Sequence, residues 1–163
     1  MLLVEAKATR KPAAARAAAV TAKNTYKETL GKAFRQINRT CQAIRDRVPA
    51  FSHIPADRPV AGLVATLDPW YMANSLARGF LPAPGIPTMA ASVRGVEQLV
   101  AIGQRRRASA VLSEIMRPDD ERQSWELNTA LQAFAEPADR NPLLDQAWAR
   151  LPFNEQPHRP GGG

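Results

Sequence analysis

The 163-residue sequence has very little cysteine and histidine and has no long apolar run. Its one cysteine, Cys41, excludes an intramolecular disulfide, and two distant histidines, His53 and His158, provide no ligand cluster for zinc. The longest apolar stretches, such as residues 60–67, fall far short of the ~20 residues that span a bilayer, so we expect no membrane contact. The first residues do not resemble a signal peptide, and we therefore expect a cytoplasmic protein.

Positive charge is concentrated in the first part of the chain. Residues 1–50 hold eleven lysines and arginines against three acidic residues, whereas the rest of the chain is almost neutral. This asymmetry favours a surface that faces a polyanion, although a solvated lysine-rich face gives the same count. The residues that we expect to contact nucleic acid are Arg10, Lys11, Arg16, Lys23, Lys32, Arg35 and Arg39.

The apolar pattern predicts a strand, a long helix and a second strand in the first half of the chain. Residues 1–7 form a short apolar run that is typical of a strand. In residues 23–48, apolar side chains recur every three or four positions, which predicts one buried helix stripe. The stripe consists of Tyr26, Leu30, Phe34, Ile37, Cys41, Ile44 and Val48. Residues 60–67 are almost continuously apolar, as in a parallel strand buried on both faces.

The second half of the chain is expected to be mostly helical. Residues 88–91 are a candidate short strand, and Ser92 is a plausible N-cap for a helix that ends at Gly103. Further helices are expected over about 106–116, after Asp119 and Asp120, and from Asn141 to Leu151. We therefore expect an α/β protein with a partial core in residues 1–91, a helical part in 92–151 and a disordered tail in 152–163.

Glu5 and Lys7 are the residues best suited to chemistry. They are two positions apart on the first predicted strand and therefore share one of its faces. A carboxylate there can bind Mg²⁺, a hard cation that prefers oxygen ligands, and an ammonium can stabilise charge that develops on a phosphate. The same two side chains would also be compatible with an exposed ion pair of little energetic consequence.

The order of these features resembles the second half of the PD-(D/E)XK nuclease superfamily, which has an αβββαβ restriction-endonuclease-like core. Residues 2–7 (Leu-Leu-Val-Glu-Ala-Lys) resemble its third strand, residues 23–48 the following helix and residues 60–67 the fourth strand. The resemblance covers residues 1–67. It implies Mg²⁺-dependent hydrolysis of phosphodiester bonds, more often in DNA than in RNA. In its terms Glu5 is the metal ligand, Lys7 the electrostatic catalyst and Gln36 a positioning group, with Lys32 as a weaker match.

The sequence departs from the family pattern at one point. In the family an Asp on the strand before Glu-x-Lys also binds the metal, and only Met1 to Val4 precede Glu5 here. We therefore expect a truncated or degenerate nuclease-like domain that cleaves DNA only if the missing Asp is supplied. Its first strand would expose an edge that invites pairing with a second copy or a partner chain. The alternatives are a non-enzymatic module for protein interaction or nucleic-acid binding, and a basic ribosome- or nucleoid-associated protein.

Overall fold

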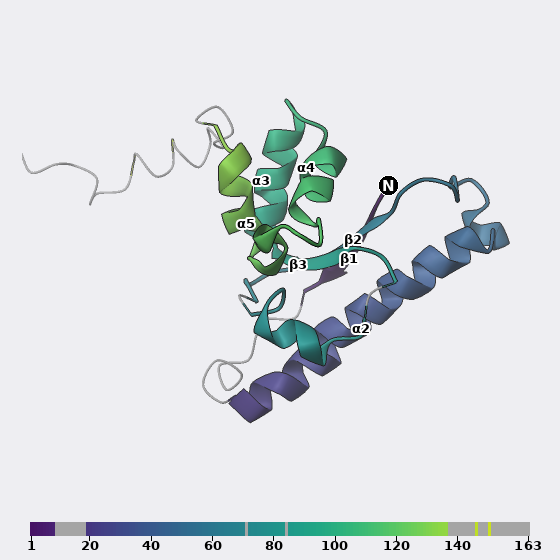
Figure 1. Ribbon diagram of the computed structural model, residues 1–163, viewed down its shortest axis with the longest axis horizontal. Helices are drawn as coiled ribbons and strands as arrows, with labels where there is room; N and C mark the ends of the chain where they lie inside the picture. Colours follow the sequence, from purple (N-terminus) through teal and green to yellow (C-terminus); the bar gives the residue numbers. More distant parts are fainter. Residues whose placement is uncertain (9–18, 71, 84, 137–145, 147–149, 151–163) are drawn as a thin grey trace, which may run out of the picture.

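The protein is a mixed α/β structure in three layers. The computed structural model describes residues 1–8, 19–70, 72–83, 85–136, 146 and 150. Three parallel strands, β1 (Leu2–Lys7), β2 (Ala61–Thr66) and β3 (Thr88–Ser92), form a sheet in the order β1-β2-β3. Figure 1 shows α2 (Ala19–Arg45) on one side of this sheet, with α3 (Val93–Gly103), α4 (Ala108–Ile115) and α5 (Leu127–Ala130) on the other. The predicted α/β class is confirmed at this level.

Two hydrophobic clusters, one on each face of the sheet, hold the layers together. Because side chains alternate along a strand, adjacent residues of β2 serve opposite clusters: Val64 packs against α2, and Leu63 packs against the helices of the other layer. Both side chains are completely buried. The prediction that residues 60–67 contain a strand buried on both faces is therefore confirmed.

The long helix α2 follows the predicted stripe except at its C-terminal end. Six of the seven apolar positions are at most 3% exposed, and they are Tyr26, Leu30, Phe34, Ile37, Cys41 and Ile44. The prediction for Val48 is wrong: its side chain is 40% exposed. The helix ends at Arg45, and Arg47 then adopts a left-handed conformation with φ of 53°, so Val48 no longer continues the helical periodicity.

The segment between β2 and β3 packs in the same layer as α2. It contains the 3₁₀ helix η2 (Leu76–Phe80). Another 3₁₀ helix, η1 (Pro49–Phe51), lies earlier in the chain, between α2 and β2. Trp70 is 3% exposed, and its ring meets that of Tyr26 edge to face with centroids 4.9 Å apart. This segment thereby covers the side of α2 that β1 and β2 leave open.

The helices after β3 pack directly on the sheet, with Leu63 and Met89 in their core. Ser92 caps α3 as predicted, since its Oγ accepts a hydrogen bond from the Gly95 backbone N–H. The helix expected over about 106–116 is α4, which begins two residues later than expected, at Ala108. Among the residues that the structure describes, no helix is both long and apolar enough to cross a membrane.

The single helix expected after Asp119 and Asp120 is instead interrupted once, so that prediction is wrong. The 3₁₀ helix η3 (Glu121–Ser124) is separated by two residues from α5, which continues directly into the 3₁₀ helix η4 (Leu131–Phe134). The break occurs because Glu126 is extended and uses its side chain to cap α5. The helix expected over 141–151 and the tail at 152–163 lie outside the described residues, apart from the isolated positions 146 and 150.

Candidate active site

Glu5 and Lys7 lie side by side on the face of β1 that is covered by α2. The Lys7 Nζ donates a hydrogen bond of 2.7 Å to Glu5 Oε1. In the parallel register these two residues are paired with Val64 and Thr66 of β2, so they occupy the carboxyl-terminal half of the edge strand. Their side chains are 26% and 18% exposed, respectively, which leaves the pair accessible from one side. The strand alternation therefore produces the shared face that the sequence predicted.

Gln36 of α2 completes a three-residue cluster with this pair. The Lys7 Nζ donates a second hydrogen bond, of 2.8 Å, to Gln36 Oε1. Gln36 directly precedes the buried Ile37, so it lies about 100° away around the helix, on the flank rather than in the core. The structure thus brings together Glu5, Lys7 and Gln36, while their role in catalysis stays a prediction.

A glycine in β2 allows α2 to lie close enough to the sheet for this contact. A Cβ added at Gly62 would lie 2.8 Å from Ile37 Cγ2 and 2.6 Å from Thr88 Oγ1. Such distances are too short for real side chains, so any larger residue would push the helix or β3 away. Since Ile37 is the neighbour of Gln36, the same close approach sets the distance between Gln36 and Lys7.

The position and composition of the cluster suit recognition of a phosphate. In open α/β sheets ligands bind outside the carboxyl ends of the strands, which is where Lys7 lies. An ammonium has three N–H donors, and the hydrogen bonds of Lys7 to Glu5 and Gln36 use two of them, which leaves one for an anion. Its two partners fix the direction of the ammonium before any ligand arrives.

Glu5 fits Mg²⁺ only as one ligand of a larger set. Magnesium is usually bound by one or two carboxylates together with waters and substrate oxygens. Within the described parts of the chain, no group of three His, Cys, Asp or Glu side chains is arranged to hold a metal ion. Two other acids of the first half, Asp57 and Asp68, flank β2 in the sequence without forming such a group with Glu5.

The predicted nucleic-acid contacts that the structure describes lie along α2. Lys23, Lys32, Arg35 and Arg39 are all exposed to solvent. Lys32 is four residues before Gln36 and Arg39 three residues after it, so both lie about one turn from the cluster. Lys23 is partly engaged, with its Nζ 5.0 Å from the centre of the Phe80 ring. The other three predicted contacts, Arg10, Lys11 and Arg16, lie outside the described residues.

Sequence reasoning missed a buried carboxylate and an amide that bridges two elements. Glu126 is 7% exposed, and its two oxygens accept hydrogen bonds from Ser92 N, Ser92 Oγ and Asn128 N, so its role is structural. Asn38 on α2 bonds to the backbone of Ala83 and Gly85. The prolines around Gly85 predict a loop, but nothing in their spacing shows that this loop docks on α2.

Comparisons with protein families, with curated proteins and with solved structures find nothing that matches this chain. The resemblance of residues 1–67 to a nuclease superfamily therefore stays a prediction from the sequence.

Proposed function

We propose that this chain carries the Glu-x-Lys part of a phosphodiester-hydrolysing site and binds nucleic acid, DNA in preference to RNA, in the cytoplasm. The observation that carries this proposal is the pair of hydrogen bonds from Lys7 to Glu5 and Gln36. In this proposal β1, α2 and β2 correspond to the second half of a restriction-endonuclease-like core, in which such a triad faces the scissile phosphate.

The three side chains have distinct roles in this proposal. Lys7 stabilises the negative charge that grows on the phosphate as water attacks and the bond to the leaving oxygen breaks. Gln36 is a positioning residue that holds the Lys7 ammonium on the solvent side of β1. Glu5 would be one carboxylate ligand of a Mg²⁺ ion, which would supply a Lewis acid that polarises the phosphoryl oxygens.

The second carboxylate for Mg²⁺ comes, in this proposal, from a strand that pairs with β1. In the described sheet β1 is an edge strand, because β2 is its single partner. A strand added there would lie about 4.8 Å from β1 and could place an acidic side chain next to Glu5. The segment that supplies it is another part of the polypeptide or a partner chain.

The exposed cations of α2 provide the nucleic-acid contacts. Lys32 and Arg39 lie about one helical turn from Gln36, and Arg35 directly precedes it, so a nucleic-acid strand bound by these cations would lie near Lys7. Such contacts position a nucleic acid without reading its sequence.

The direct test is metal-dependent nicking of plasmid DNA. Where a strand that pairs with β1 supplies the second carboxylate, we expect Mg²⁺-dependent cleavage by the wild-type chain and its loss in Glu5→Gln and Lys7→Met. Glu28→Gln and Lys27→Met, two exposed positions of α2, are matched controls that should keep the wild-type rate. Equal rates in all five proteins would identify a contaminating nuclease and overturn the proposal.

A second candidate, a protein-interaction module, is favoured by the surface of β1. Val4 is 54% exposed on the face opposite α2, and the outer edge of β1 has no strand partner in the described sheet. Size-exclusion chromatography with light scattering separates the two functions. A stable oligomer that Val4→Lys dissociates, with no affinity for nucleic acid, would favour the module. The control is Val100→Lys, at a position that is 59% exposed on α3.

A further inference from the structure

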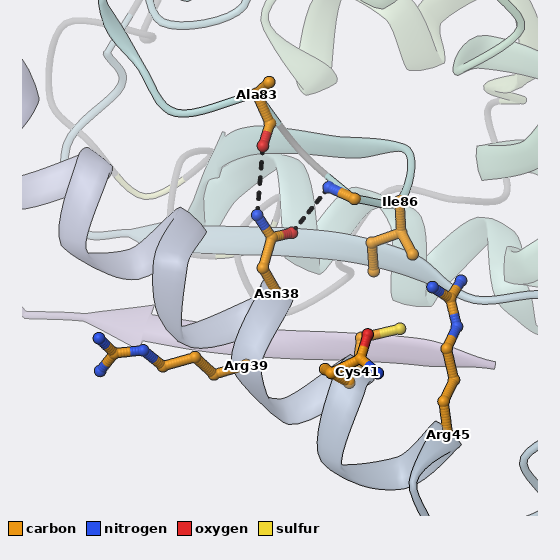
Figure 2. Close-up of a pocket in the computed structure, with 8 residues that line it drawn as sticks. Asn38, Arg39, Cys41, Arg45, Ala83 and Ile86 are labelled. Atoms are coloured by element: carbon orange, nitrogen blue, oxygen red, sulfur yellow. Dashed lines mark hydrogen bonds between the residues drawn. The ribbon is translucent and has the colours of Figure 1, made fainter.

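A pocket of about 380 Å³ lies between α2 and the loop that leads into β3, on the flank of the helix away from β1 (Figure 2). Its volume is at the lower end of the range of roughly 300–1,000 Å³ found for small-ligand sites. The α2 residues that line it follow Gln36 in the chain, but they face the loop instead of the edge strand. It is therefore separate from the Glu5–Lys7–Gln36 cluster.

The pocket wall is held in place by one amide side chain. The Asn38 Nδ2 donates a hydrogen bond of 3.3 Å to the Ala83 carbonyl, and its Oδ1 accepts one of 3.0 Å from the Gly85 N–H. Figure 2 shows both bonds spanning the space between helix and loop. The apolar part of the lining comes from Cys41 and Ile86, which are 2% and 6% exposed. The pocket thus exists before a ligand binds.

Two arginines of α2 belong to the lining of this pocket. Arg39 and Arg45 are six residues apart on α2, about 9 Å along the helix axis. In Figure 2 Arg45 extends towards Ile86, whereas Arg39 extends in the opposite direction, away from Ile86. Neither forms an ion pair or a side-chain hydrogen bond with another residue in the part of the chain that the structure describes. The neighbouring acid, Asp46, accepts a hydrogen bond of 2.8 Å from Gln42.

An apolar pocket with one cation at its rim matches a ligand that joins a planar group to an anion. A nucleotide within a strand has this chemistry, because its base is linked through the sugar to a phosphate. Guanidinium groups bind phosphates through paired N–H donors, and unpaired bases pack on apolar and guanidinium surfaces. A base inside a duplex is stacked between its neighbours and cannot enter such a pocket.

We propose that this pocket binds one unpaired nucleotide of a nucleic-acid strand, with the base against Ile86 and Cys41 and a neighbouring phosphate on Arg45. This inference rests on the proposed function, since it takes nucleic acid as the ligand and adds that the strand is single at this point. The strand would cross the exposed face of α2 between the pocket and Lys7.

Gly85 offers a way to block the pocket without disturbing the fold. A Cβ at Gly85 would lie 3.7 Å from Asn38 Oδ1, an ordinary contact, and the backbone there has no positive φ. Gly85→Leu should therefore fill the pocket, while Gly79→Leu is the matched control because a Cβ at Gly79 has no atom within 4 Å. Arg45→Ala removes one cation, and Arg94→Ala, an exposed arginine of α3, controls for the charge.

The experiment measures binding of a fluorescent eight-nucleotide DNA by the full chain, as a single strand and as a duplex. We expect Gly85→Leu and Arg45→Ala to weaken single-strand binding by about five- to a hundredfold, the range expected for loss of one stacked base. Duplex binding should change much less, and both controls should bind as the wild type does. Thermal unfolding of each variant confirms that it is folded.

Three outcomes would overturn the inference. Unchanged single-strand binding in Gly85→Leu and Arg45→Ala would show that the pocket takes no nucleotide. An equal loss of duplex binding in Arg45→Ala would show that Arg45 makes general phosphate contacts. Equally tight binding of a nucleoside monophosphate would assign the pocket to a free nucleotide. Glu5→Gln separates the two proposals, because it should abolish cleavage and leave the binding that depends on the pocket intact. The cleavage proposal can therefore fail while the pocket proposal holds, and the reverse.

Discussion

The Lys7 ammonium on β1 and the Gln36 side-chain oxygen on α2 lie 2.8 Å apart, although the two residues are separated by 29 positions in the sequence. This contact joins the edge strand to the helix that crosses over it, and it fixes Lys7 next to Glu5. A lysine at an exposed strand end would otherwise keep the freedom of its four-carbon chain, which costs free energy to restrict. The Lys7 ammonium is therefore oriented by one residue of the strand, Glu5, and one residue of the helix, Gln36.

Removal of the Gln36 amide tests its positioning role. In Gln36→Leu the Lys7 ammonium loses a charge-assisted hydrogen bond of about 1.5–3 kcal/mol, so kcat for cleavage should fall by about ten- to a hundredfold. KM should stay near the wild-type value, because the cations of α2 that bind the nucleic acid are unchanged. Asn24→Ala, an exposed amide on the same helix, is the control. A rise in KM without a fall in kcat would contradict the role.

Salt dependence tests the contribution of α2 to nucleic-acid binding. The slope of log K against log[salt] changes by about 0.9 for each phosphate contact that is lost, so replacing Lys32, Arg35 and Arg39 by Ala should reduce it by roughly two to three. Fluorescence anisotropy at several salt concentrations measures this slope. Replacing Arg58, Arg94 and Arg117, exposed arginines outside α2, changes the net charge equally and should have a smaller effect. Equal slopes for the two triple variants would show that only net charge matters.

A methyl group at Gly62 should separate α2 from the sheet. The added Cβ would collide with Ile37 and Thr88, and overpacking of this kind typically costs about 1–3 kcal/mol of unfolding free energy. Urea unfolding of Gly62→Ala measures that loss. Gly79→Ala, where the added atom has open space around it, should remain within about 0.5 kcal/mol of the wild type. Equal stability of the two variants would show that Gly62 does not limit the approach of the helix.

Acid should weaken the packing of η3 against α4, because Arg122 pairs with Asp120 as well as with Glu114 of α4. Hydrogen bonds from Arg122 hold the pKa of Asp120 at about 2, below its ordinary value of 3.8. Because the pKa is lower in the folded state, this stabilisation is complete above about pH 4 and is lost as the pH falls towards 2. Thermal unfolding of the wild type between pH 6 and pH 2 should show this loss.

Asp120→Asn should remove that part of the pH dependence, whereas the exposed neighbouring substitution Asp119→Asn should retain it. Identical pH profiles for the wild type and Asp120→Asn would show that the Asp120–Arg122 pair contributes nothing to acid sensitivity.

The sequence predicted the parts of the fold that depend on local periodicity. The spacing of Leu30, Phe34 and Ile37 identifies the buried side of α2, and the alternation along β1 places Glu5 and Lys7 on one face. Gln36 was chosen from a family resemblance and from its place on the helix flank. Periodicity cannot show which strands are neighbours, so the central place of β2 had to come from the structure.

Contacts between distant segments were the main source of errors and omissions. Glu126 interrupts the helix expected after Asp120 because it binds Ser92, 34 positions earlier. The loop at Gly85 contacts Asn38 through its backbone groups, and backbone hydrogen bonds cannot be predicted from the pattern of side chains. The prediction for Val48 was wrong for a local reason, because the spacing of apolar residues does not reveal the left-handed conformation of Arg47.

The measurement that tests the central claim most directly is paramagnetic broadening of the Gln36 side-chain amide signal by Mn²⁺, in the presence of a non-cleavable phosphorothioate oligonucleotide. It needs no turnover, so it does not depend on a second carboxylate for activity. If Glu5 binds the metal and Lys7 the phosphate, the Gln36 signal should broaden at substoichiometric Mn²⁺ in the wild type and in Glu28→Gln, and should stay sharp in Glu5→Gln. A Gln36 signal that remains sharp in the wild type, or broadens equally in Glu5→Gln, would contradict the account.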